Sequence, residues 1–301
     1  MIKSLKNNML RLIRCFFECT NLKNHKIITF CGIRFKFKLK PSQFSKSQFM
    51  LKHFISSNIQ GSGNSVRSLI HGKWRKINVK DIDSNFWIKG NNNIVKFGFE
   101  TKRFPKGLNL TINGSNNYIE FIGSVKFKNT EIEIKDNNNI FKIKEPARVV
   151  KDCYFCLGGL SEVNIDKACG LNMGLYAIIN NNFKKRHKLT IGQGVFIGKG
   201  VIIRTSDGHA ILDPESKVAV NAPQDVEIGD NVWIGARNMI LKGAKIPAGS
   251  IVGAQSVVNK KFDEPNILLA GCPAKIIRHN VLWDVSNYGQ YMKNKQLQGV
   301  K

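Results

Sequence analysis

The sequence predicts an all-β solenoid built from triangular coils, because three features recur in step along residues 189–262. Aliphatic residues occupy every sixth position in two runs, small or modest residues follow most of them by four positions, and glycines follow many directly. The aliphatic positions are Ile191, Ile197 and Ile203, then Ile228, Ile234, Ile240, Ile246, Val252 and Val258. Neither a helix nor an isolated strand requires a period of six. We therefore expect each hexad to form one face of a coil of about eighteen residues.

Each position of the hexad has a predicted place in the coil. The aliphatic side chains should point into the prism, and the smaller residues should fit the crowded corners. The smaller residues are Val195, Val201, Val232, Ala244, Ser250 and Ser256. Glycine eases a sharp bend because it lacks a Cβ. The glycines in phase are Gly192, Gly198, Gly229, Gly235 and Gly253.

Three asparagine-rich tracts divide the region 62–188. They lie at 90–93, 114–117 and 136–139, and each precedes a segment of alternating apolar and polar residues. Asparagine and glycine tolerate a left-handed backbone, so each tract is expected to form a corner between strands. We interpret this region as looser coils of the same solenoid, with a separate small β domain as the alternative.

The N-terminal segment, residues 1–61, is strongly basic. Apolar residues within 1–19 fall near helical spacing between Lys3, Lys6, Arg11 and Arg14, which predicts an amphipathic helix. Charges interrupt any apolar run long enough for a transmembrane span or a secretory signal. The helix either packs on its own domain or lies on an anionic inner leaflet. Residues 25–40 alternate apolar and basic side chains and predict one strand.

Composition limits the partners and the compartment. The chain of 301 residues has a formal net charge of +26, which suits nucleic acid, an anionic membrane, a nucleotide-containing cofactor or an acidic glycan. No nucleic-acid-binding motif is visible, so nucleic acid is not an expected partner. Seven cysteines without a regular framework favour a reducing compartment. Cys153 and Cys156 form a lone CxxC, which we interpret as two buried small hydrophobic residues rather than a zinc or redox site.

The hexad register breaks at a histidine. Continuing from Ile203, the next two expected core positions hold Asp207 and His209, and the register resumes one residue out of phase at Ile228. A charged group and a titratable ring are costly in a dry interior, so the chain should leave the prism here. We predict an extruded loop over 207–225 that carries functional residues.

Two flanking segments complete the organisation. Residues 180–188 form a polar, basic excursion that is either a solvated loop or part of an acceptor or phosphate site. The C-terminal segment, 263–301, is expected to leave the hexad pattern and to end in a short helix and a tail after residue 281.

The hexad segments are similar to a known family. IGQGVFIGKGVIIRTSDGHAI, VEIGDNVWIGARNMILKGAKIPAGSIVGAQSVVNK and AGCPAKIIR resemble the hexapeptide-repeat, left-handed parallel β-helix acyltransferases, especially sugar O-acetyltransferases of bacterial capsule and lipopolysaccharide pathways. This resemblance, close over roughly residues 189–280, implies a cytoplasmic homotrimer, peripheral to the inner membrane face if residues 1–19 bind it. It also implies acetyl-CoA as co-substrate and a sugar or polysaccharide as acceptor.

The resemblance also implies catalytic roles. His209 would be the general base that takes a proton from a sugar hydroxyl as it attacks the thioester, which suits an imidazole pKa near neutrality. Asp207 would orient or polarise the ring, unless it only caps the turn at Gly208. No cysteine or serine is placed as an acyl carrier, which favours direct transfer.

Cofactor contacts follow from stacking and from the resemblance. Residues eighteen apart should lie one above another, as for Ala236 with Ala254 and Lys242 with Lys260. The resemblance implies coenzyme A contacts at Ala236, Ala254, Asn259 and Lys260, with Lys275 and Arg278 near the nucleotide. Trp233 takes an outward position and should line the acyl pocket or a subunit interface. No metal is expected.

Two other functions stay open on the sequence. A zinc-dependent β-helix hydratase needs three converging histidines, whereas only His187 and His209 lie in or near the solenoid core. A non-catalytic β-helix that binds or supports a partner would not depend on His209. We expect an acetyl-CoA-dependent O-acetyltransferase.

Overall fold

A computed structural model describes residues 17–22, 25–30, 33–38, 59–70, 72–76, 86–98, 105, 107–171, 173–179 and 184–298 of the chain. The chain divides into two compact units, Met1–Ser57 and Asn58–Lys301, which are treated separately below.

The first unit contains a three-stranded antiparallel sheet. Its strands are β1 (Phe17–Leu22), β2 (His25–Phe30) and β3 (Ile33–Lys38), in that order. Two expectations are therefore wrong. The helix predicted over 1–19 does not extend to its end, because residues 17–19 pair with β2, whereas residues 1–16 lie outside the described residues. The single strand expected over 25–40 is two strands paired with each other, a contact that periodicity alone does not reveal.

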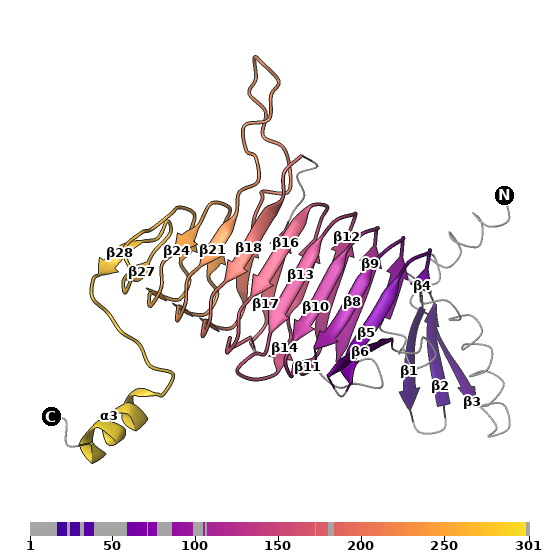
Figure 1. The fold of residues 1–301 in the computed structure, drawn as a ribbon, viewed down its shortest axis with the longest axis horizontal. Coiled ribbons are helices and arrows are strands. Elements are labelled where there is room, and N and C mark those ends of the chain that lie inside the picture. The colour runs from indigo at the N-terminus through magenta and orange to yellow at the C-terminus, as the bar shows by residue number, and fades with distance from the viewer. Residues whose placement is uncertain are drawn as a thin grey trace. The chain divides into compact units, whose positions relative to one another are not determined.

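The second unit is a parallel β-helix, with strands stacked coil on coil (Figure 1). We call its three sheets wall 1, wall 2 and wall 3, since the chain visits them in turn. Wall 1 contains β5 (Ser65–Ile70), β6 (Lys73–Lys76), β8 (Ile94–Gly98), β10 (Tyr118–Ile122), β13 (Ile140–Lys144), β16 (Ser161–Ile165), β18 (His187–Ile191), β21 (Val226–Ile228) and β24 (Lys245–Ile246). This architecture confirms the predicted all-β fold.

The other walls have the same stacked arrangement. Wall 2 contains β4 (Ile59–Gln60), β7 (Phe86–Lys89), β9 (Leu108–Asn113), β12 (Thr130–Lys135), β15 (Tyr154–Leu157), β17 (Leu175–Ile179), β20 (Val201–Arg204), β23 (Met239–Ile240) and β26 (Val257–Val258). Wall 3 contains β19 (Phe196–Ile197), β22 (Trp233–Ile234), β25 (Ile251–Val252), β27 (Leu268–Ala270) and β28 (Lys275–Arg278). A separate two-stranded sheet in the earlier coils contains β11 (Phe127–Lys128) and β14 (Val150–Lys151).

The asparagine tracts form corners, as predicted. Asn92 and Asn116 have positive φ angles of 55° and 58°. The last asparagine of each tract turns inward, and successive side-chain amides donate to the side-chain oxygen one coil below, at 2.9 Å from Asn117 to Asn93 and 3.0 Å from Asn139 to Asn117. This ladder satisfies the hydrogen bonds of buried polar groups.

β16 pairs directly with β18, which spans the boundary expected at residue 188. The asparagine-cornered coils and the hexad coils therefore share one sheet.

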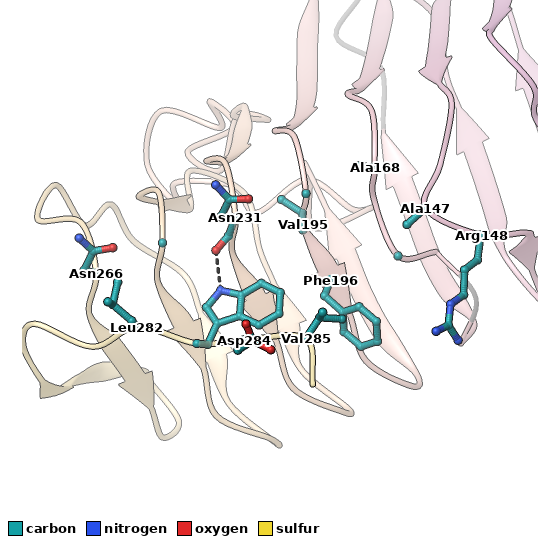
Figure 2. Close-up of a pocket in the computed structure, with 14 residues that line it drawn as sticks. Ala147, Arg148, Ala168, Val195, Phe196, Asn231, Asn266, Leu282, Asp284 and Val285 are labelled. Atoms are coloured by element: carbon teal, nitrogen blue, oxygen red, sulfur yellow. Dashed lines mark hydrogen bonds between the residues drawn. The ribbon is translucent and has the colours of Figure 1, made fainter. Parts of the chain in front are cut away.

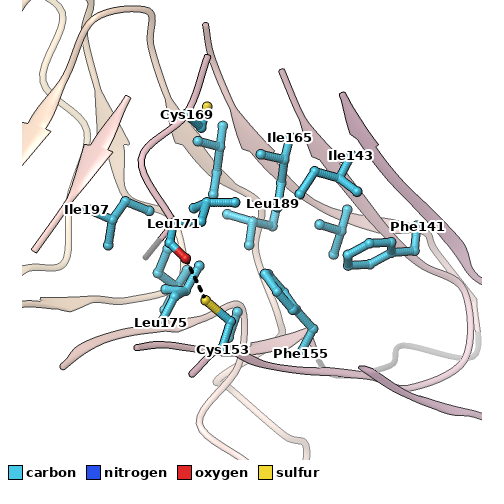
Figure 3. Packing of buried hydrophobic residues seen from close by; sticks show 14 of the residues in the cluster. Phe141, Ile143, Cys153, Phe155, Ile165, Cys169, Leu171, Leu175, Leu189 and Ile197 are labelled. Atoms are coloured by element: carbon cyan, nitrogen blue, oxygen red, sulfur yellow. Dashed lines mark hydrogen bonds between the residues drawn. The ribbon is translucent and has the colours of Figure 1, made fainter. Parts of the chain in front are cut away.

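The interior of the β-helix is packed with aliphatic and phenylalanine side chains. Figure 3 shows Phe141 and Phe155 among them, with ring centroids 5.2 Å apart in an edge-on contact. Cys153 and Cys156 are buried free thiols, as the lone CxxC predicted, and burial raises both pKa values. Cys153 Sγ donates to the carbonyl oxygen of Leu171 at 3.3 Å.

The C-terminal segment leaves the hexad pattern, as expected. After β28, residues 282–285 lie along the β-helix, and the segment ends in the helix α3 (Tyr288–Leu297). Asn287 caps this helix, because its side chain accepts from Gln290 N at 3.0 Å. Within the described ranges, no helix is long and apolar enough to cross a membrane.

Candidate active site

A long loop leaves the β-helix between β20 of wall 2 and β21 of wall 1 (Figure 1). Its tip is closed by an isolated antiparallel bridge between Leu212 and Ala219. Thr205 and Ser206 are still buried at its root, whereas Asp207 and His209 are exposed. The break in the hexad register therefore marks the place where the chain leaves the prism.

Asn221 joins the two arms of this loop. Its Nδ2 donates to Asp207 Oδ2 and to the carbonyl oxygen of His209, both at 2.8 Å. Its Oδ1 accepts from the backbone N–H of Ile211 at 2.8 Å. One side chain on the returning arm thus holds both backbone groups that flank residue 210, which fixes the backbone of His209.

Asp207 is bound by a lysine of the next coil. Lys242 Nζ donates to Asp207 Oδ2 at 2.5 Å and to the carbonyl oxygen of Asn221 at 3.0 Å. The hydrogen bond from Lys242 holds the pKa of Asp207 below its ordinary value, and Asn221 contributes in the same direction. The described contacts of this carboxylate are with the loop and Lys242 rather than with the ring of His209.

His209 presents its ring to solvent. Within the described residues, the structure gives its imidazole no hydrogen-bond partner, while its carbonyl oxygen is held by Asn221. Gly208 precedes it with a φ of +90°, and a Cβ at this position would lie 2.9 Å from Arg204 Nη2. The positive φ, rather than the contact with the movable arginine end, favours glycine at this position.

The returning end of the loop is tied to β18. Asp225 Oδ1 accepts from the backbone N–H of Lys188 at 2.9 Å and lies 3.2 Å from His187 Nδ1. His187 is 4% exposed, and its Nε2 has no partner within the described structure. The excursion expected through residue 188 thus ends earlier, because His187 and Lys188 begin β18 and the inward histidine is anchored by Asp225.

The predicted cofactor residues do not form one continuous row. Ala236 and Ala254 do stack at the corner between wall 3 and wall 2, where a Cβ on Gly235 would lie 2.8 Å from Ala254 N. Asn259 and Lys260 follow β26 and lie at the corner between wall 2 and wall 1. They therefore share the corner of the loop rather than that of the alanines.

The remaining predicted cations lie in two places, and Lys275 is beside the alanine corner because it pairs with Ala270, which stacks on Gly253. Lys275 and Arg278 lie on β28, at the edge of wall 3, and both are exposed. Lys242 was expected to stack with Lys260, but its ammonium donates to Asp207 and to the carbonyl oxygen of Asn221 in the loop. Lys260 instead places its Nζ 5.3 Å from the ring centroid of Phe262. Lys245 pairs with Lys261, so the eighteen-residue step shortens here.

Trp233 points outward on wall 3, as predicted, and is 41% exposed. Its indole lies 6.1 Å, centroid to centroid, from that of Trp283 in the C-terminal segment. Trp283 Nε1 donates to the carbonyl oxygen of Asn231 at 2.6 Å, so this segment covers part of the corner between wall 1 and wall 3 (Figure 2). A groove of about 560 Å³ continues from there past Phe196 towards Arg148.

Sequence reasoning missed Asn221, Asp225, Lys242 as a loop anchor, and Trp283. The hexad period carries no information about contacts between two arms of a loop. A signal for Asn221 was available, since asparagine in a long loop commonly bonds backbone groups. Trp283 lies outside every repeat, and its position depends on the path of the C-terminal segment.

No group of three or more His, Cys, Asp or Glu that could hold a metal occurs among the described residues. His187 and His209 belong to separate networks, one inward and one exposed. The site is thus an exposed imidazole on an anchored loop, with the corner lined by Ala236 and Ala254 at the opposite edge of wall 2.

Comparisons with known proteins place these features in context. The family described as bacterial transferase hexapeptide (six repeats) matches residues 225–260. A polysialic acid O-acetyltransferase of Neisseria meningitidis is 30% identical over 207 residues, covering 68% of this chain and 91% of the relative. One of Escherichia coli O1:K1 / APEC is 38% identical over 96 residues, and that match spans 31% of the relative. The crystal structure of the polySia-specific acetyltransferase NeuO superposes with a TM-score of 0.54 at 25% identity, covering 80% of this chain and 94% of that one.

Proposed function

Because the chain belongs to the hexapeptide-repeat acetyltransferases, we propose that it transfers an acetyl group from acetyl-CoA to a hydroxyl of a bacterial surface polysaccharide or its sugar precursor. The observation that carries this proposal is the anchored loop with an exposed His209 at its start. An acidic polysaccharide is the first acceptor to test, given the relatives named as polysialic acid O-acetyltransferases and the net charge of +26.

His209 acts as the general base in this proposal. Its ring takes the proton of the acceptor hydroxyl as the oxygen attacks the thioester carbonyl, and coenzyme A leaves as the thiol once it is protonated. The exposed imidazole is accessible to an incoming sugar, and the carbonyl of the same residue is fixed by Asn221. Asp207 serves as a positioning residue, because its carboxylate ties the loop to Lys242.

Acetyl-CoA binds along the alanine corner in this proposal. Ala236 and Ala254 leave the backbone open to the pantetheine arm, while Lys275 and Arg278 offer charge for phosphates. Asn259 and Lys260 belong to the other corner, so in this arrangement they face coenzyme A only where two subunits meet. Trp233 forms a wall of the acetyl pocket.

A homotrimer brings these two corners together. Within one chain the His209 corner and the alanine corner lie on opposite edges of wall 2. The outer face of wall 2 carries an apolar row in register: Tyr154, Tyr176, Ile202, Met239 and Val257. Tyr176 and Met239 are 44% and 37% exposed, as expected for a surface that a second copy covers. Sedimentation as a monomer at micromolar concentration would contradict this arrangement.

The function is tested by incubating the purified full chain with labelled acetyl-CoA and a panel of glycans. The panel should include polysialic acid, other acidic polysaccharides and neutral oligosaccharides, with mass analysis of each product. We expect acetyl esters on an acidic acceptor and no product without the glycan. Binding of glycans without any transfer or release of coenzyme A would instead favour a non-catalytic module.

A further inference from the structure

The end of wall 1 away from the loop carries a patch of cations and aromatic rings. We call this the outer basic patch, and its members are Arg67, Trp74, Lys76, Lys96, Tyr118 and Lys142. Its edge strand β6 consists of Lys73, Trp74, Arg75 and Lys76, all exposed. Among the described strands, β6 pairs only with β5 and is the last strand of wall 1.

The register places these side chains on the outer face of the wall. Val66 and Ser68 of β5 are buried, so Arg67 between them points outward. Lys76 pairs with Arg67, and Trp74 pairs with Leu69, two residues along β5. Lys96 is the parallel partner of Arg67 on the next strand, and Lys142 follows two strands further on.

The cations of the patch are held over the rings. Lys96 Nζ lies 5.2 Å from the ring centroids of both Trp74 and Tyr118, and Lys142 Nζ lies 5.5 Å from that of Tyr118. Among the described residues, none of the patch cations has an ion pair with a carboxylate. Glu120 is the acid within the patch, placed between Lys96 and Lys142 in register. With the four cations Arg67, Lys76, Lys96 and Lys142 against this one carboxylate, the patch presents a net positive charge.

The same wall connects the patch to the proposed active site. Between β6 and β18 lie β5, β8, β10, β13 and β16, which at strand spacing amounts to roughly 30 Å. Glu162 of β16 is already matched by Arg186 and Lys188. On the described strands from β6 to β18, a linear polyanion can thus follow wall 1 without meeting an unpaired carboxylate other than Glu120. Beyond β18, Glu227 is exposed on β21 in register with Lys245.

We infer that the outer basic patch holds a distant stretch of a linear acidic polysaccharide while another stretch of the same polymer reaches the loop of His209. This inference rests on the proposed function, since it makes the polymer the acceptor. Lys96 lies over both rings and Lys142 over Tyr118, which leaves less of the ring faces open for base stacking. The patch also lacks the exposed aliphatic side chains that insert into a bilayer. The consequence is that acceptor affinity depends on polymer length.

The test compares two triple variants of the full chain. Arg67→Gln/Lys76→Gln/Lys96→Gln removes patch charge, whereas Lys126→Gln/Lys128→Gln/Lys151→Gln removes the same charge from the β11 and β14 region. Each is assayed with polysialic acid fractionated into short oligomers and long chains. Removal of the patch charge should raise KM for long chains roughly tenfold, with kcat unchanged and short oligomers unaffected. The control triple should leave all values near those of the parent, and the wild-type preference for long chains should fade with salt.

Direct binding separates this inference from the proposed function. Affinity for long polysialic acid, measured without acetyl-CoA, should fall in the patch variant even if the wild-type chain acetylates no glycan tested. Equal loss in both triples would show a general charge effect and overturn the inference, as would unchanged binding in the patch variant. Patch-dependent binding to anionic vesicles or single-stranded DNA, without binding to the polysaccharide, would assign the surface to another partner and overturn it too. Thermal melting of each variant checks that it folds.

Discussion

The asparagine-cornered coils and the strict hexad coils form one β-helix, but they differ in strand length and in the residues at their corners. In the first, strands such as β9 and β12 have six residues, and the corners carry a ladder of buried asparagines. In the second, strands such as β22 and β25 have two residues, and Trp233 pairs with Ile251 eighteen residues on. The longer strands form broad walls with phenylalanine inside, whereas the shorter ones bring corners close together.

The residues that stabilise the fold and the residues of the proposed active site lie in different regions. The buried phenylalanine rings and the amide ladder belong to the first region, and Asp207, His209, Ala236 and Ala254 belong to the second. Changes in the first should therefore alter unfolding, and changes in the second should alter turnover.

The largest effect should follow His209→Asn, which keeps a polar side chain but removes the base. Turnover should fall by roughly 10² to 10⁴, while thermal stability and coenzyme A affinity stay near those of the parent, because the ring is exposed and outside the core. Steady-state kinetics and calorimetric titration with coenzyme A give both values. Parental turnover in this variant would end the assignment of His209 as base.

The converse effect is expected from Asn117→Ala in the asparagine ladder. Asn117 is 1% exposed, and its Oδ1 accepts from the backbone and side chain of Asn139 at 2.8 Å and 3.0 Å. Losing this buried acceptor should reduce the free energy of unfolding by about 3 kcal/mol, with turnover per folded molecule unchanged. Asn116→Gly is the matched control at the same corner, because Asn116 is exposed with a φ of 58° and glycine accepts that angle. Denaturant melts that ranked the two variants equally would refute the ladder's role.

A smaller effect on turnover should follow Asn221→Ala. The variant frees the carbonyl of His209 and the carboxylate of Asp207, so we expect a loss of about tenfold from a less well placed base. Asn221→Asp tests the donor specifically, since it cannot supply the Nδ2 hydrogens. Stability should hardly change, because the loop lies outside the core, and an equal loss of melting temperature and activity would argue for a merely structural contact.

The pH dependence of the same network has a defined sign. The pKa of Asp207 is lowered by Lys242, so the charged carboxylate contributes above the ordinary aspartate pKa and its contribution is lost only as pH falls through the lowered value. The anchor is thus intact across neutral pH. Asp207→Asn should lower turnover by a similar factor at every pH from 6 to 9, leaving the acidic limb of the profile in place. A displaced acidic limb would instead show that Asp207 acts directly on the imidazole.

The smallest effect concerns the basic N-terminal segment. Deleting residues 1–19 should weaken association with anionic vesicles several-fold at low salt, as expected for a basic amphipathic segment, without altering activity on short acceptors. Vesicle flotation at two salt concentrations measures this. Equal partitioning of the full and truncated chains would show that these residues do not contact the membrane.

Much of the fold could be predicted because each coil of the repeat requires the same residue types at the same positions. The six-residue period identified the hexad coils, and the asparagine tracts identified the earlier corners, since each pattern reports a local backbone requirement. The predicted end of the N-terminal helix and the predicted single strand at 25–40 were wrong. Both depend on strand pairing, as between Phe17 and Phe30, which is not a local property of the sequence. Trp233 was placed outward correctly from its position within the hexad.

The sequence by itself determined the coil, the direction of each hexad side chain and the residue at which the chain leaves the prism, because these follow from periodicity and from the cost of burying charge. Only the tertiary structure decided what holds the loop. Asn221 and Lys242 reach Asp207 from positions 14 and 35 residues away, and no period relates them. It also decided where the repeat shortens, because two residues are lost between the pairs Met239 with Val257 and Lys245 with Lys261. A repeat fixes which wall follows which, whereas contacts between loops and coils depend on where the whole chain places them.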